Sequence, residues 1–292
     1  MPAAITRREW LRLSAGALLS LGVWPGRLRG ADAPAHDDFT FIAVNDLHAL
    51  EEACRPWFDD VVCQMKASAP TAEFCLLGGD LADNGTPAQL TLIKDSFSAL
   101  GIPCHAVVGN HDYQSATDRS AYEGIFPEQI NYSFTHRGWQ IIGLDSSEGT
   151  KSRETRISAT TLTWLDQNLS KLDLRRPTIL FTHFPLGDSV LARPLNADDL
   201  LERCYGLNLQ AVFCGHFHGF TERPFRHSII TTDRCCARVR SNFDGSPEKG
   251  WFVCQAVNGE IKRRFVEFRP NESRGDSLSF DPHVITRPIT YH

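Results

Sequence analysis

The residues from Val107 to Asp112 place metal-binding and proton-transferring side chains directly after an apolar segment. One glycine separates the two valines from Asn110, His111 and Asp112. If the apolar segment is a buried strand, these three side chains emerge together at its carboxyl end. An amide, an imidazole and a carboxylate in one place are suited to binding a divalent cation or moving a proton.

Four other apolar segments have the same form. They are residues 41–44 before Asp46-Leu47-His48, 74–77 before Gly79-Asp80, 178–181 before His183, and 211–214 before His216-Phe217-His218. In open α/β sheets, ligands bind beyond the carboxyl ends of the strands. Five such ends carrying Asp, Asn and His therefore predict a single metal site.

The elements that must position these side chains are those of an α/β fold. From residue 39 onward, short apolar segments alternate with helical patterns in a chain long enough to bury a large core. Helices are expected from Thr86-Pro87 to Leu100, from Ser158 to before Pro177, and from Asn196. Strands are expected over 104–108, over a hairpin of 130–136 and 139–145, and over 228–232, 251–257 and 261–268.

The first 33 residues have the composition of an export signal. Arg7 and Arg8 precede an apolar segment over residues 13–24, and Ala31-Asp32-Ala33 is a small-x-small cleavage pattern. Paired arginines before an apolar segment are typical of the twin-arginine export machinery, so we expect a periplasmic or extracellular protein. The apolar segment is too short to span a bilayer, which needs about 20 residues. The alternative is a basic N-terminal helix of the folded protein.

The formal charge of the chain narrows the classes of partner that it can bind. Residues 1–33 carry five arginines and two acidic residues, so their removal changes the formal charge from -5 to -8. An acidic chain with no basic stripe excludes extended nucleic acid as a partner, whereas a small phosphorylated substrate fits a cationic metal site. The domain is expected over residues 34–270, and a polar tail follows over 271–292.

The nine cysteines include no C-x-x-C pair. Cys75, Cys104 and Cys214 lie in apolar segments and are expected to pack as small hydrophobic side chains. The other six leave a disulfide open: Cys54, Cys63, Cys204, Cys235, Cys236 and Cys254.

The motifs in chain order are Asp46-x-His48, Gly79-Asp80-x-x-Asp83, Gly109-Asn110-His111-Asp112, His183 and Gly215-His216-x-His218. This order resembles the calcineurin-like metallophosphoesterase superfamily. Within it, the branch containing class III cyclic-nucleotide phosphodiesterases and glycerophosphodiesterases is the most similar. The resemblance implies a four-layer α-β-β-α sandwich of two mixed β-sheets flanked by helices, with the metal site at the carboxyl ends of the strands.

The same resemblance implies two divalent metal ions, which could be Mn, Fe, Zn, Co or Ni. The first would be bound by Asp46, His48, Asp80 and His218, and the second by Asp80, Asn110, His183 and His216, with Asp80 bridging. Residues two apart face opposite sides of a strand, so both D-x-H and H-x-H must lie in turns. The flanking Gly215 and Gly219 would permit such turns.

The implied reaction is attack on phosphorus by a hydroxide bridging the two ions. Asn110 would help to offset the charge on the phosphoryl oxygens, and His111 would protonate or stabilise the leaving alkoxide. Asp83 and Asp112 would orient imidazoles or ligand loops. Two positions depart from related patterns: Phe184 replaces a second histidine, and Asp83 replaces the tyrosine of purple acid phosphatases.

The function expected is hydrolysis of a small phosphodiester. A phosphomonoesterase or nucleotidase on the same scaffold is the nearest alternative. A binding module that has lost its metals is disfavoured because all the implied ligand positions are filled. A DNA nuclease is disfavoured by the acidic balance.

Overall fold

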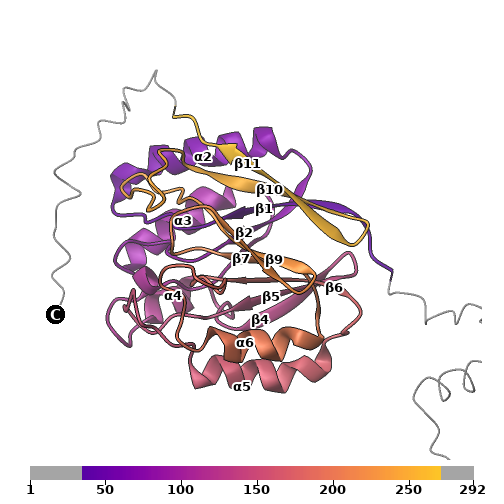
Figure 1. Cartoon of the computed structure of the whole chain (residues 1–292). Coiled ribbons are helices and arrows are strands. Elements are labelled where there is room, and N and C mark those ends of the chain that lie inside the picture. The colour runs from indigo at the N-terminus through magenta and orange to yellow at the C-terminus, as the bar shows by residue number, and fades with distance from the viewer. Residues whose placement is uncertain (1–34, 271–292) are drawn as a thin grey trace, which may run out of the picture. The chain divides into compact units, whose positions relative to one another are not determined.

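The computed structural model describes residues 35–270, and Figure 1 shows the arrangement of their helices and strands. The expected export signal, residues 1–33, and the expected tail, residues 271–292, lie outside the described residues. The strands are β1 (Phe39–Val44), β2 (Ala72–Leu77), β3 (Cys104–Ala106), β4 (Tyr132–His136), β5 (Trp139–Leu144), β6 (Pro177–Thr182), β7 (Asn208–Cys214), β8 (Thr221–Phe225), β9 (Ser228–Thr232), β10 (Gly250–Val257) and β11 (Glu260–Glu267). The helices are α2 (Arg55–Ser68), α3 (Pro87–Ser98), α4 (Ser120–Ile125), α5 (Ala159–Asn168) and α6 (Ala197–Arg203).

The strands form two mixed sheets. The first has the order β11-β10-β1-β2-β3, in which β1, β2 and β3 are parallel and β10 and β11 are antiparallel to their neighbours. The second has the order β4-β5-β6-β7-β9-β8, in which only the edge strands β4 and β8 pair antiparallel. The strands expected to carry the metal ligands are therefore parallel within each sheet, and their carboxyl ends meet at one edge.

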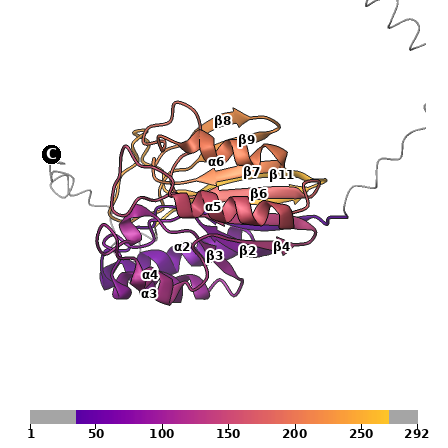
Figure 2. The ribbon, with the colours of Figure 1, turned by 90° about the horizontal axis from the view of Figure 1, so that it is seen from below.

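Alternating side chains along the strands build a layered core. Phe39 and Phe41 of β1 point between the two sheets, whereas Ile42 and Val44 point toward the helices α2 and α3. A separate cluster packs the second sheet against α5 and α6. Figure 1 shows α2 on one side of the sheets and α5 and α6 on the other, and Figure 2 shows α3 and α4 beside β2 and β3. The four-layer α-β-β-α sandwich is thus confirmed.

All three expected helix starts are confirmed, but only two of them have a side-chain cap. The hydroxyls of Thr86 and Ser158 accept hydrogen bonds from the third residue after each, so both cap their helices. Asn196 precedes α6 but makes no capping bond, because its side chain pairs with the backbone of Ile157 instead. The patterns above do not predict α2, although its buried residues recur at helical spacing: Trp57, Phe58, Val61, Val62 and Met65.

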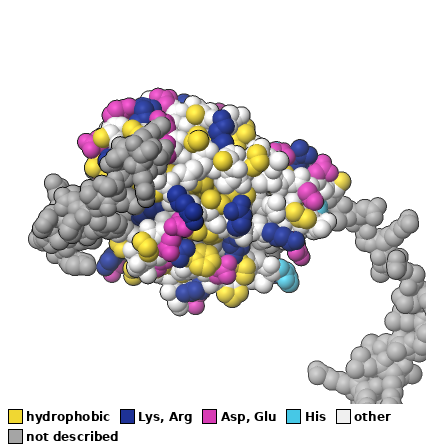
Figure 3. Space-filling model, turned by 90° about the horizontal axis from the view of Figure 1, so that it is seen from above, with side chains coloured by type: hydrophobic (Ala, Val, Ile, Leu, Met, Phe, Trp, Pro, Cys, Tyr) yellow, Lys and Arg dark blue, Asp and Glu magenta, His cyan; other side chains and the backbone are white. Residues whose placement is uncertain are grey.

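Cysteines and surface charge complete the description. All nine cysteines are free thiols, so none of the disulfides left open by the sequence is present. Among residues 35–270, no helix is long and apolar enough to cross a bilayer. Figure 3 shows acidic and basic side chains interspersed over one face, which lacks the continuous basic stripe that extended nucleic acid requires.

Candidate metal centre

The structure brings every predicted ligand to one edge of the two sheets. Asp46 and His48 follow β1, Asp80 follows β2, and Asn110 lies in a 3-10 turn, η2 (Asn110–Asp112), after β3. His183 follows β6, and His216 and His218 follow β7. Two donor groups result, each with its ligand atoms within 4.8 Å of one another: Asp46, His48, Asp80 and His218, and Asp80, His183 and His216. Asn110 joins the second group, because its Oδ1 lies 3.2 Å from His183 Nε2.

Asp80 is placed to serve both groups. Its Oδ1 lies 3.3 Å from His183 Nε2, and its Oδ2 lies 3.6 Å from His48 Nε2. One carboxylate therefore directs one oxygen to each donor group. This is the arrangement that a bridging ligand needs to hold two divalent ions about 3.5–4 Å apart.

Five of the seven predicted ligands occupy the left-handed backbone region. The φ angles are 55° for Asp46, 47° for His48, 50° for Asp80, 65° for His216 and 45° for His218. This confirms that the D-x-H and H-x-H pairs lie in turns, but the strain falls on the ligands and not on the flanking glycines. Gly215 is required for a different reason, because a Cβ there would stand 2.8 Å from Asp46 Oδ2. At Gly219 a Cβ would stand 2.9 Å from the Phe217 ring, so both flanking glycines make room for the H-x-H turn.

Backbone carbonyls fix how three of the imidazoles are protonated. His183 Nδ1 lies 3.0 Å from the Gly78 carbonyl, His216 Nε2 lies 2.9 Å from that of Ser152, and His218 Nδ1 lies 3.1 Å from that of Ser241. A carbonyl oxygen only accepts, so each of these nitrogens carries the hydrogen and the opposite nitrogen of a neutral ring carries a lone pair.

The opposite nitrogens face each other inside the site. His183 Nε2 lies 3.2 Å from His216 Nδ1, and His48 Nε2 lies 3.1 Å from His218 Nε2. Two neutral imidazole lone pairs at this distance repel each other unless a proton or a cation lies near both. Carboxylate oxygens and imidazole nitrogens are ligands that Mn, Fe, Zn, Co and Ni accept. The residues present therefore fit two divalent ions.

The charge balance of the ion-free site favours a proton on His183. Burial favours the neutral ring, but the carboxylates of Asp80 and Asp46 outweigh it and raise the pKa of His183 to about 9. Burial and the neighbouring His183 lower the pKa of His216 to about 3. Burial opposes the charge of Asp46 as well, but His218 and His183 lower its pKa to about 2. Below pH 9, the ion-free site thus carries a proton on His183 that a metal must displace. Burial favours a neutral His218 as well, but the Asp46 carboxylate outweighs it and raises the pKa of His218 above its usual range.

Metal affinity is therefore expected to rise with pH. A cation entering the group of Asp80, His183 and His216 displaces the His183 proton, so affinity should increase about tenfold per pH unit between pH 6 and 8 and level off near pH 9. Calorimetric titration of metal into ion-free protein, in buffers of different ionisation enthalpy, counts the protons released. Release of no proton at pH 7 would contradict this assignment.

Asp83 links a ligand to a distant arginine. Its Oδ1 lies 3.3 Å from His48 Nδ1, and the same oxygen accepts from Arg240, whose Nε lies 2.8 Å away. His48, Asp83 and His111 form a third donor group, but there the Arg240 guanidinium already supplies the positive charge. Burial raises the pKa of Asp83, and His48 and Arg240 outweigh that effect and lower it to about 2. Asp83 is thus placed to orient the His48 ring.

Removal of the Asp83 carboxylate is expected to weaken one metal position selectively. Asp83→Ala should lower metal affinity about 10–100-fold at the group containing His48, because the ring loses the partner that fixes its orientation. The group of His183 and His216 should change little. Metal titration followed by elemental analysis measures both, and Asp198→Ala, which removes an exposed carboxylate paired with Arg193, is the control. Equal weakening at both groups would contradict the link.

Asp112 and His111 lie beside the donor groups without joining the first two. The buried carboxylate of Asp112 accepts from the backbone of Ala82 and of Gly109, both at 2.8 Å, so it holds the two ligand loops and no imidazole. His111 donates its backbone N–H to Asp80 Oδ1 at 2.8 Å, and its Nδ1 lies 2.8 Å from the carbonyl of Asp83. The His111 ring is partly exposed and lies 4.8 Å from that of His48.

Phe184 follows the ligand His183, at the position where the family resemblance suggested a second histidine. Its side chain is fully buried, and its ring centroid lies 4.0 Å from that of His216. The Phe184 ring therefore has no surface open to solvent. Phe184 instead packs against a ligand and holds it in place.

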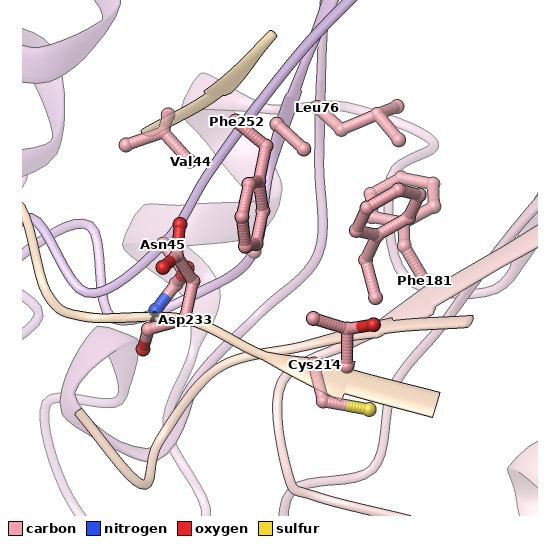
Figure 4. Close-up of a pocket in the computed structure, with 11 residues that line it drawn as sticks. Val44, Asn45, Leu76, Phe181, Cys214, Asp233 and Phe252 are labelled. Carbon is pink, nitrogen blue, oxygen red and sulfur yellow. Dashed lines mark hydrogen bonds between the residues drawn. The ribbon is translucent and has the colours of Figure 1, made fainter. Parts of the chain in front are cut away.

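Some residues that support the metal ligands belong to none of the sequence motifs. Asn45, next to Asp46, donates to the Asp46 carboxylate and, at 3.3 Å, to the Asp233 carbonyl. Figure 4 shows Asn45 and Asp233 together at one end of a cavity whose walls include Phe181 and Phe252. This cavity of about 20 Å³ lies between the sheets and has room for about one water molecule, so it is not the substrate site.

Comparisons with known proteins agree with this geometry. The chain is 33% identical over 150 residues to a probable cyclic nucleotide phosphodiesterase of Synechococcus, covering 49% of this chain and 56% of that relative. It is 33% identical to a 3′,5′-cyclic-nucleotide phosphodiesterase of Nostoc, covering 72% of this chain and 75% of the relative. It is 25% identical to the glycerophosphodiester phosphodiesterase GpdQ of Enterobacter lignolyticus, covering 73% and 79%.

A solved structure supports the fold alone. Purple acid phosphatase from yellow lupin superposes with a TM-score of 0.62 at 12% identity, covering 79% of this chain and 52% of that chain. The model of the family described as calcineurin-like phosphoesterase matches residues 39–220, which contain both donor groups. The chain therefore belongs to the calcineurin-like phosphoesterase family, whose members are hydrolases of phosphoester bonds that depend on two divalent metal ions.

Proposed function

We propose that this protein hydrolyses a small phosphodiester, such as a cyclic nucleotide or a glycerophosphodiester. The observation that carries the proposal is the pair of donor groups that share Asp80, with imidazole lone pairs directed inward. The relatives from Nostoc and Enterobacter, named for cyclic nucleotides and glycerophosphodiesters, support the substrate class. When bound, the two ions supply Lewis acidity and a hydroxide nucleophile from water.

The roles of the chain's own residues follow from their positions. Asp46, His48, Asp80, Asn110, His183, His216 and His218 would hold the ions. The Asn110 Oδ1 faces His183, so its Nδ2 is available to donate to a phosphoryl oxygen. His111 Nδ1 donates to the Asp83 carbonyl, which fixes the ring and leaves Nε2 free. In its doubly protonated form the ring would give the Nε2 proton to the leaving oxygen.

Activity on two model substrates distinguishes a phosphodiesterase from a phosphomonoesterase and from a non-catalytic binding module. Protein loaded with Mn²⁺ is assayed on bis(p-nitrophenyl) phosphate and on p-nitrophenyl phosphate, and we expect a higher kcat/KM on the diester. A higher value on the monoester would favour a phosphomonoesterase or nucleotidase. No turnover on either substrate with Mn²⁺, Fe²⁺, Zn²⁺, Co²⁺ or Ni²⁺ would favour a non-catalytic binding module.

We also propose export through the twin-arginine machinery, with loss of residues 1–33. The support is the order of Arg7, Arg8, the apolar segment and Ala31-Asp32-Ala33 in the sequence. N-terminal sequencing of the protein recovered from the periplasm or medium of its host should begin near Pro34. An intact N-terminus on cytoplasmic protein would contradict the proposal.

A further inference from the structure

Phe243 is the most exposed large hydrophobic side chain among residues 35–270, and it touches a metal ligand. Its exposed fraction is 66%. Its ring lies nearly parallel to the ring of His218, with 5.2 Å between centroids and 22° between planes. The Phe243 backbone N–H donates to the His218 carbonyl at 2.9 Å. A scattered exposed hydrophobic residue is ordinary, but this one stacks on a residue of the candidate metal centre.

The loop that carries Phe243 is braced by its own side chains. The buried Asn242 amide accepts from the Cys235 N–H at 3.0 Å and donates to the Glu248 carbonyl at 2.7 Å. Arg234 Nε donates to the Ser246 hydroxyl at 2.6 Å. The next-door Ser241 carbonyl accepts from His218. An exposed ring on a braced loop is held in one place, so a ligand that contacts it does not have to order it first.

The position of the ring fits a planar part of the substrate. One face of Phe243 lies on His218, and the high exposure of the side chain leaves the remaining surface open to solvent. His218 belongs to a donor group, so a substrate whose phosphoryl group binds there would have this ring as a neighbour of the site. A single flat ring outside any pocket gains most from another flat ring, because stacking needs no enclosing wall.

We propose that Phe243 is a specificity-determining residue that stacks against the nucleobase of a cyclic nucleotide substrate. This inference rests on the proposed phosphodiesterase function and narrows its substrate class. It favours a cyclic nucleotide over a glycerophosphodiester, which has no ring to stack. The competing role for Phe243 is purely structural, as a cover that holds His218 in place.

The test compares two substrates and three variants of the metal-loaded protein. Phe243→Leu removes the aromatic face, Phe243→Trp enlarges it, and Phe220→Leu is the matched control. Phe220 is also exposed and lies two residues after His218. Its ring packs on that of Phe252, with 6.2 Å between the ring centroids. The substrates are 3′,5′-cyclic AMP, which has a base, and glycerophosphoethanolamine, which has none. Metal content is measured for each variant.

We expect Phe243→Leu to lower kcat/KM for cyclic AMP about tenfold, mainly through KM, and to change it less than about twofold for glycerophosphoethanolamine. Phe243→Trp should keep or raise the value for cyclic AMP, and Phe220→Leu should match the unmodified protein on both. An equal loss on both substrates, or no loss on cyclic AMP, would overturn the proposal. A loss of metal in Phe243→Leu would assign the structural role instead.

A failure of the proposed function is separately visible. If the unmodified protein hydrolyses neither substrate, the phosphodiesterase proposal fails, and binding then decides the role of Phe243. Calorimetric titration with AMP and with glycerol 3-phosphate should show Phe243→Leu weakening AMP about tenfold and leaving glycerol 3-phosphate within about twofold. Equal affinity of the unmodified protein and of Phe243→Leu for AMP would overturn the stacking role.

Discussion

Asp80→Ala is expected to remove both metal ions from the purified protein and to lower phosphodiester turnover by about 10³-fold or more. The reason is that Asp80 directs one oxygen to each donor group, 3.3 Å from His183 Nε2 and 3.6 Å from His48 Nε2. Every other ligand belongs to only one of the two groups that share Asp80. Elemental analysis of the dialysed protein, together with turnover of bis(p-nitrophenyl) phosphate, measures both effects.

The control is a carboxylate that lies far from the site. Asp166 is an exposed residue of α5 whose carboxylate pairs with Arg203 of α6. Asp166→Ala should keep both ions and full turnover. Circular dichroism of Asp80→Ala checks that the sandwich remains folded. Retention of two ions by folded Asp80→Ala would show that this carboxylate does not bridge, and the assignment of the second group would then have to change.

The features that the sequence predicted are those that depend on local residue types. The ligand motifs stand directly after apolar strands, and parallel strands end at one edge, so the meeting of Asp46, Asp80 and His183 followed from strand positions alone. The Thr86 cap with Pro87 behind it fixed the start of α3 in the same way.

The features that could not be predicted from the sequence depend on contacts between segments that are distant along the chain. The carbonyls of Gly78, Ser152 and Ser241 set the protonation of three ligand histidines, and any residue type supplies a carbonyl. Arg240 reaches Asp83 across 157 residues of chain with no motif of its own. The left-handed backbone of the ligands was hidden for a related reason, because Asp and His seldom adopt it without support from the surrounding fold.

His111→Ala is expected to keep both metal ions and to lose about 10²-fold or more in turnover. Its side chain belongs to neither of the two groups that share Asp80, and the backbone N–H that holds Asp80 Oδ1 remains after the substitution. Its loss therefore removes the proton donor and leaves the ligands in place. His111→Asn is the matched variant, because an amide can still donate to the Asp83 carbonyl but cannot transfer a proton.

The leaving group provides a sharper test of the same role. A p-nitrophenolate leaves with little help from an acid, whereas the alkoxide of glycerophosphoethanolamine is strongly basic and needs a proton. The loss in His111→Ala should accordingly be larger for glycerophosphoethanolamine than for bis(p-nitrophenyl) phosphate, by about tenfold or more. Equal losses on the two diesters would mean that His111 positions the phosphoryl group and does not protonate the leaving oxygen. Full activity on both would remove His111 from the reaction altogether.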